Sequence, residues 1–299
     1  MGSSRLDIGK YGVWTFQFDS VPAAQAAEEV AVLDDLGFGA VWFPEAVGRE
    51  AFTHAALLLR GGHDIIVATG VAQIWGRDAM AAAAAHKTLT EAYPDRFLLG
   101  LGVSHQPMVE GLRGRDYSLP YTAMVDYLDA MDRSIFVAAQ PSTAPHRVLA
   151  ALGPRMLALA AERADGALTY FVPPEHTAAA RAALGPDPLL AVEQAVVLET
   201  DPARAREIAR THTRLYTGLP NYTNNLRRLD PSLGDDDFAD GGSDRVVDSV
   251  VAWGDMDTVL ARIAAHHDAG ADHVCIQIID GTAAVPHTAW HDLAAALDL

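Results

Sequence analysis

The stretch PAAQAAEEVAVLDDLGFGAVWF, residues 22–43, contains the unit from which the fold can be deduced. Pro22 suits the first turn of a helix, and apolar residues recur behind it at helical spacing: Ala27, Val30, Ala31 and Leu33. Gly37 can end that helix in a left-handed cap, and the apolar run 40–43 then resembles a buried strand. The stretch therefore predicts a helix, a glycine turn and a strand in that order.

The same order occurs twice more, with Gly166 ahead of the run 167–170 and Gly270 ahead of the run 273–278. Short apolar runs alternate with alanine-rich helical stretches along the whole chain, which is typical of parallel strands joined by crossover helices. This alternation predicts eight strands: 8–14, 40–43, 64–71, 97–102, 147–151, 167–170, 189–197 and 273–278.

Eight such units favour an α/β fold of the (β/α)8 TIM barrel type, formed by residues 1–299 as a single domain. The length suits a barrel, which takes roughly 250 residues plus insertions. A doubly wound open sheet is less favoured because no predicted strand is followed by G-x-G-x-x-G. The polar, turn-rich residues 215–249 have few apolar anchors, and we expect them to form a lid insertion before the last helix.

Composition excludes several classes of function. The formal net charge of -17 opposes binding to nucleic acid and to anionic membranes. The lone Cys275 rules out an intrachain disulfide, and the chain shows neither an apolar run of membrane-spanning length nor a signal peptide, so we expect a cytoplasmic protein. The adjacent His266 and His267 point to different faces of a helix, and no metal site is predicted.

Active sites of such barrels lie at the carboxyl ends of the strands, where three positions suggest chemistry. Ala151, Leu152 and Gly153 lead into a helix that begins at Pro154, so their free amides predict an anion site or, equally well, an ordinary helix start. His105, two residues beyond a strand, can exchange protons or be a turn histidine bonded to backbone.

Glu45 follows the second predicted strand. Its carboxylate can hold a ring nitrogen or hydroxyl of a ligand, or it can pair with Arg49 on the surface.

Three segments resemble the luciferase-like flavin and deazaflavin oxidoreductases, and in particular their actinobacterial coenzyme F420-dependent subgroup. They are ATGV at 68–71 followed by Arg77, DRFLLGLGVSH at 95–105, and the segment from Gly153 to Gly166. The resemblance covers nearly the whole chain. It implies hydride transfer between coenzyme F420 and a small organic substrate, and a homodimer.

The resemblance also implies roles for individual residues. Glu45 would lie near the cofactor, whereas the catalytic histidine of related sugar-phosphate dehydrogenases is replaced by Ala46. A cis peptide packed against the deazaflavin ring would fall at Gly70–Val71. His105 stands where the family's proton donor is commonly a glutamate, directly after Val103 and Ser104 at the cofactor.

The cofactor's phosphate would lie on the amides of Leu152 and Gly153, next to Ala151 and with Tyr170 at the neighbouring strand end. Pro173 replaces a lysine of the family, a loss for which Arg155 could compensate. Three aromatic residues are expected as walls of the substrate pocket: Trp14, Trp75 and Tyr222. Three alternatives remain: an FMN-dependent monooxygenase on the same barrel, a non-catalytic flavin-binding relative, and an unrelated barrel hydrolase or lyase.

Overall fold

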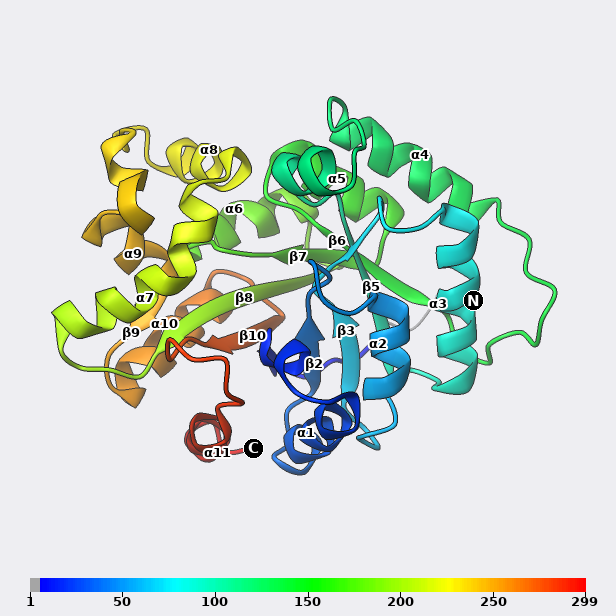
Figure 1. The fold of residues 1–299 in the computed structure, drawn as a ribbon, viewed down its shortest axis with the longest axis horizontal. Helices are drawn as coiled ribbons and strands as arrows, with labels where there is room; N and C mark the ends of the chain where they lie inside the picture. Colours follow the sequence, from blue (N-terminus) through cyan, green and yellow to red (C-terminus); the bar gives the residue numbers. More distant parts are fainter. Residues whose placement is uncertain (1–5) are drawn as a thin grey trace.

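The computed structural model describes residues 6–299, which form a closed parallel barrel surrounded by helices (Figure 1). The eight barrel strands are β1 Tyr11–Trp14, β2 Ala40–Phe43, β3 Ile66–Thr69, β5 Phe97–Gly102, β6 His146–Ala150, β7 Gly166–Thr169, β8 Leu189–Val197 and β10 His273–Ile278. β10 pairs in parallel with both β1 and β8, which closes the sheet. Two short strands join its rim, β4 Ala72–Gln73 beside β5 and β9 Val251–Trp253 beside β8. The predicted (β/α)8 barrel is confirmed.

The outer helices are α1 Ala23–Asp35, α2 Ala51–Leu58, α3 Ala79–Ala92, α4 Pro120–Asp132, α5 Pro154–Arg163, α6 Pro174–Leu184, α10 Met256–Asp268 and α11 His287–Ala296. The glycine turns follow the sequence pattern, since Gly37 has φ of 87° and Gly270 has φ of 102°. Both angles lie in the left-handed region that glycine adopts without a steric penalty. The chain therefore reverses from helix to strand at both positions, as predicted.

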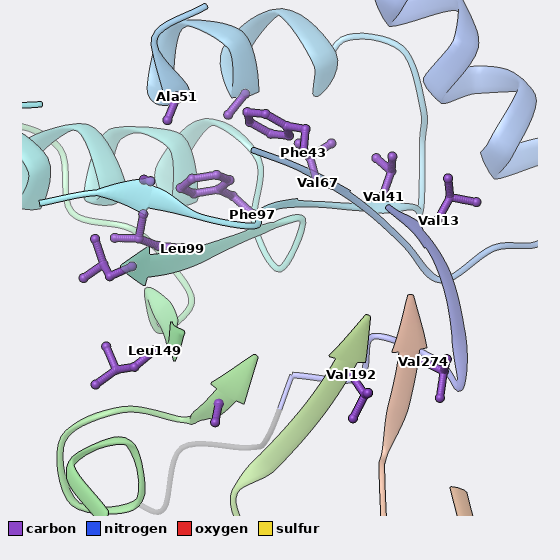
Figure 2. Close-up of a cluster of buried hydrophobic side chains, with 14 of the residues drawn as sticks. Val13, Val41, Phe43, Ala51, Val67, Phe97, Leu99, Leu149, Val192 and Val274 are labelled. Carbon is purple, nitrogen blue, oxygen red and sulfur yellow. The ribbon is translucent and has the colours of Figure 1, made fainter. Parts of the chain in front are cut away.

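Side chains alternate along each strand between the barrel interior and the helical layer. Val41 and Phe43 pack against the helices together with Val13, Val67 and Phe97 (Figure 2). Trp42 points the other way, into an interior cluster with Leu98, Val148 and Leu168. Every barrel strand is thus buried on both faces, which explains why the strands are continuous apolar runs.

One polar pair stands inside this apolar interior. Trp42 Nε1 donates to His273 Nε2 at 3.0 Å, while His273 Nδ1 bonds the carbonyl oxygen of Gly9 at 2.9 Å. Because Nε2 accepts, Nδ1 must carry the ring proton, and the imidazole is neutral. Burial accordingly lowers the pKa of His273 to about 4.

Residues 215–249 are helical and well anchored, which corrects the expectation of an irregular segment with few apolar contacts. They span the end of α7 Pro202–Thr217, all of α8 Pro220–Leu229, and most of α9 Asp244–Val250. These three helices are grouped at one side of the barrel (Figure 1, yellow). Their buried apolar side chains form one cluster with the end of β8: Tyr216, Leu219, Tyr222, Leu226, Leu233, Phe238, Val246 and Val247. These anchors do not stand out in the sequence because they are spaced among polar residues.

The segment connects β8 to α10, so that α10, β10 and α11 all follow it. Among residues 6–299, no helix combines the length and apolarity needed to cross a membrane.

Candidate active site

The segment after β6 forms a helix start at the carboxyl end of the barrel, as predicted. Gly153 is the residue before α5, with extended φ and ψ of -90° and 157°, and Pro154 is the first helical residue. Within residues 6–299 the amides of Leu152 and Gly153 make no backbone hydrogen bond. Free amides combined with the positive end of a helix dipole favour a bound anion.

Arg228 on α8 supplies a cation at this helix start, and the sequence argument did not find it. A Cβ atom placed on Gly153 would lie 3.8 Å from Arg228 Nη1, with no closer atom outside the neighbouring residues. The same Nη1 donates to Asn225 Oδ1 at 3.1 Å. Asn225 is 1% exposed, and its Nδ2 has no hydrogen-bond partner in the described chain. Arg155, the expected compensating charge, instead packs over the ring of Tyr121 at 4.2 Å.

Glu45 follows β2 and is bound by groups of the protein. Its Oε2 accepts from the amide of Gln73 at 2.9 Å, and its Oε1 accepts from the amide of Ala51 at 3.3 Å and pairs with Arg77. The alternative pairing with Arg49 is wrong, because that guanidinium bonds backbone carbonyls near residue 20. With its side chain 5% exposed, Glu45 joins β4 to the start of α2.

The peptide bond between Gly70 and Val71 is cis, as the resemblance implied. A Cβ on Gly70 would lie 2.6 Å from Trp14 Nε1, so no residue other than glycine fits against this indole. Trp14 is 2% exposed, and its Nε1 has no partner within residues 6–299. The structure therefore brings Trp14 and the cis peptide together at the ends of β1 and β3.

The loop after β5 is held at two carbonyl groups. Trp75 Nε1 donates to the carbonyl of Val103 at 2.8 Å, and the hydroxyl of Tyr117 donates to the carbonyl of Ser104 at 2.8 Å. Ser104 has φ of 57°, a left-handed conformation that is uncommon outside glycine. Trp75 was expected as a pocket wall, and the structure shows it supporting the loop that presents His105.

His105 lies against Tyr222 of α8, with 5.5 Å between the ring centroids. Burial lowers the pKa of His105, an effect that a hydrogen bond from the imidazole to the Asn221 side chain partly offsets. Its Nδ1 is buried and unpartnered in the described chain. At neutral pH the ring is therefore uncharged and able to accept a proton.

An aromatic cluster fills the mouth of the barrel around Tyr170, which directly follows β7. Its hydroxyl donates to Gln277 Oε1 at 2.8 Å and lies 2.9 Å from the hydroxyl of Tyr216. Since the single proton of Tyr170 is used on Gln277, Tyr216 is the donor in the second bond. The Tyr170 hydroxyl is thus directed toward β10 and α7. The cluster comprises Trp14, Tyr170, Phe171, His212, Tyr216 and Tyr222.

Two titratable residues of this region were missed by the sequence argument. Glu193 on β8 is 1% exposed, and burial raises its pKa to about 8. His212 on α7 is 8% exposed, and burial lowers its pKa to about 3. Glu193 and the adjacent Gln194 interrupt an apolar strand at 189–197, and this was the available signal, whereas nothing around His212 distinguishes it from any helical histidine.

Two surface cavities lie away from these residues. One, of about 690 Å³, lies beside β9 and α10, and the other, of about 590 Å³, lies at the amino ends of β6 and β7. The mouth itself is covered by α8, whose Tyr222 is 7% exposed and touches both His105 and Phe171. Tyr222 therefore lies between the loop after β5 and the residues after β7.

The fold and these residues define a class: a closed (β/α)8 barrel with free backbone amides at a helix start and buried polar groups at the carboxyl ends of its strands. The chain belongs to the luciferase-like monooxygenase family, whose model matches residues 10–273.

Individual relatives share this architecture. A Mycobacterium tuberculosis protein named as a coenzyme F420-dependent oxidoreductase is 27% identical over 323 aligned positions, which cover 87% of this chain and 92% of that protein. The solved F420-dependent secondary alcohol dehydrogenase, bound to an F420–acetone adduct, superposes with a TM-score of 0.73 at 14% identity, covering 95% of this chain and 96% of the other. The coenzyme F420-dependent tetrahydromethanopterin reductase of Methanopyrus kandleri gives 0.73 at 17% identity, covering 96% and 97%. At these identities the solved structures establish the fold.

Proposed function

We propose that this protein is a coenzyme F420-dependent oxidoreductase that transfers a hydride between the deazaflavin and a small organic substrate. The named relatives support the choice of cofactor. The observation that carries the proposal is a concentration of buried polar atoms without protein partners at the mouth. Among the buried unpartnered atoms of the described residues, those that lie here include Trp14 Nε1, His105 Nδ1, Glu193 Oε1, His212 Nε2 and Asn225 Nδ2.

Unpartnered buried polar groups cost roughly 1–3 kcal/mol each, so a site that gathers them is suited to a polar ligand. They adjoin one another through the aromatic cluster. Trp14 and His212 both contact Tyr170, with ring centroids 5.1 and 6.2 Å apart, and His105 contacts Tyr222. This arrangement fits a large conjugated ring with several hydrogen-bonding atoms.

The residues present also fit the tail of the cofactor. The amides of Leu152 and Gly153, together with Arg228, would hold its phosphate, while Trp14 and the Gly70–Val71 peptide would lie beside its ring. When bound, the deazaflavin supplies a carbon that accepts or donates a hydride, and it favours two-electron chemistry.

His105 would act on the substrate. Its neutral imidazole can take a proton at Nδ1 from a substrate hydroxyl as that group becomes a carbonyl, and can return the proton in the reverse direction. Trp75 and Tyr117 keep the loop rigid, so the imidazole stays in a fixed position relative to the mouth.

Titration with coenzyme F420 and with FMN, followed by fluorescence and absorbance, tests this function. We expect saturable binding of F420 and much weaker binding of FMN. Tight FMN binding with oxygen consumption would favour the monooxygenase alternative, for which the family as a whole is named. Failure to bind either compound would refute the proposal.

Two further properties complete the proposal: the protein is a homodimer, and it acts in the cytoplasm. The buried free thiol of Cys275 supports a reducing location. Light scattering of the purified protein should give about twice the chain mass of 31.9 kDa.

A further inference from the structure

Glu193 is an acidic residue inside the barrel. It faces inward from β8, where its register partner on β10 is Cys275. The inward-facing residues Ala191 and Leu189 on the same strand belong to the apolar interior cluster. A carboxyl group at this depth has lost its water, so its charged form is strongly disfavoured unless protein groups compensate.

The protein supplies only part of that compensation. Oε2 accepts one hydrogen bond, from the amide of Phe171 at 3.2 Å. Phe171 has φ of 58°, an unusual conformation for a bulky residue, at the point where its amide faces this oxygen. Oε1 has no partner among residues 6–299. Burial raises the pKa of Glu193, and the amide of Phe171 is the group that opposes this shift, so a single hydrogen bond would have to stabilise a full buried charge.

A protonated carboxyl group resolves this imbalance, because it has one O–H donor and no charge. The nearby hydroxyl of Tyr170 already donates to Gln277 and receives a bond from Tyr216. Oε1 has no hydrogen-bond partner among residues 6–299, so a proton on this oxygen is available to a ligand at the end of the barrel where the cofactor ring would lie.

We propose that Glu193 is a neutral carboxylic acid that donates a hydrogen bond from Oε1 to a carbonyl oxygen of the conjugated cofactor ring, and that only its protonated form permits binding. The inference rests on the proposed function. It assigns a binding contact that the sequence argument did not include, and it makes cofactor affinity depend on pH.

The other titratable groups that face Glu193 do not obscure this dependence. They are Tyr170 after β7, Tyr216 on α7, Tyr222 on α8 and Cys275 on β10, and burial raises the pKa of each of them above its ordinary value. All four stay neutral to at least pH 9. Burial raises the pKa of Glu193 itself to about 8, so a transition near that pH reports this carboxyl group.

The test measures the dissociation constant of F420 alone, without substrate, from pH 6.5 to 9.5. The proteins are the wild type, Glu193→Gln, and Glu29→Gln as a control. Glu29 is also a buried carboxyl group, but it lies on α1 with His287 as its partner, and it lies outside the proposed site. At pH 9 roughly one tenth of Glu193 would be protonated, so wild type and control should bind roughly tenfold more weakly than at pH 7.

Glu193→Gln should bind at pH 7 and show no such loss at pH 9, because an amide keeps a donor and cannot ionise. Comparing variants on the same ligand also removes any titration of the cofactor itself. Infrared spectra of the protein without ligand give an independent readout, in which a protonated carboxyl band at pH 7 should be absent from Glu193→Gln and retained in Glu29→Gln.

Three outcomes contradict the proposal. Wild-type affinity that is constant from pH 7 to 9.5 overturns it, as does a Glu193→Gln variant with the wild-type pH profile. A wild-type infrared spectrum with no protonated carboxyl band at pH 7 also overturns it, and this readout does not depend on any variant being folded. If wild type binds neither F420 nor FMN at any pH, the proposed function fails and this inference fails with it.

Discussion

The imidazole of His105 and the ring of Tyr222 lie 5.5 Å apart between centroids, at an interplanar angle of 50°. This contact joins the loop after β5 to α8, two segments more than a hundred residues apart in the chain. The same helix carries Arg228, beside Gly153. One helix therefore both covers the mouth of the barrel and places a cation beside the helix start at Gly153.

His105→Ala should lower the turnover number by about 10²–10⁴-fold, the usual contribution of a general acid or base, while F420 affinity stays nearly unchanged. Because burial lowers the pKa of His105, the wild-type rate should fall only below pH 6.5 as the imidazole becomes protonated. Steady-state rates and binding constants, with the exposed His63→Ala as control, measure both effects. Lost binding with an unchanged turnover number would make His105 a cofactor ligand instead.

Gly153→Asp should abolish F420 binding and leave the fold intact. The Cβ of the added side chain meets nothing closer than Arg228 Nη1 at 3.8 Å, so it fits sterically, but its carboxylate would occupy the proposed anion site and repel a phosphate. Circular dichroism checks folding, and fluorescence titration measures affinity. A folded variant with wild-type affinity would show that the amides at Gly153 do not hold the cofactor phosphate.

Arg228→Gln should weaken F420 binding roughly 10–100-fold, since hydrogen bonds to a charged group contribute roughly 1.5–3 kcal/mol. The matched control is Arg204→Gln, an exposed arginine on α7 whose partner is Glu207. Raising the salt concentration should narrow the gap between wild type and Arg228→Gln. Equal affinities of the two variants would show that Arg228 does not face the cofactor.

Amide hydrogen exchange of α8 should slow when F420 binds, because Tyr222 and Arg228 both belong to the site. In the free protein we expect 215–249 to exchange faster than the barrel strands. The buried residues Leu219 and Leu226 give α8 partial protection. Helix α11, remote from the site, should not change. Uniformly slow exchange of 215–249 in the free protein would argue for a structural element rather than a lid.

Acid should destabilise the protein partly through His273. Its folded-state pKa is lowered to about 4, whereas in the unfolded chain it is near the ordinary 6.5. Between these values only the unfolded state binds the proton, so this contribution to the free energy of unfolding is present above pH 6.5 and is lost as the pH falls toward 4. The loss is about 3 kcal/mol over that range. Urea unfolding at pH 7 and pH 5 should show a smaller difference for His273→Gln than for wild type, and equal differences would contradict the assignment.

Much of the fold follows from local sequence. Four strands have the predicted bounds, Ala40–Phe43, Phe97–Gly102, Leu189–Val197 and His273–Ile278. The left-handed turns at Gly37 and Gly270 and the helix start at Pro154 also agree. These features depend on residues a few positions apart, whose periodicity and conformational preferences are visible in the chain itself. The cis bond at Gly70–Val71 came from family resemblance, and no local preference would have shown it.

Only part of the candidate active site could be predicted from the sequence. The positions of His105 and Gly153 after their strands were enough to predict them as site residues. The ion pair of Glu45 with Arg77 and the position of Arg228 beside Gly153 could not be predicted, because they depend on which loops meet once the barrel closes. The apolar residues that anchor 215–249 could not be recognised from the sequence pattern, because Tyr222 and Phe238 are buried by other segments rather than by their neighbours in sequence.

Sequence by itself determined a parallel barrel and the end of the barrel at which its active site is expected, since these follow from short-range periodicity. Tertiary structure alone decided the raised pKa of Glu193 and the covering of the mouth by α8, because desolvation and long-range contact exist only in the folded chain.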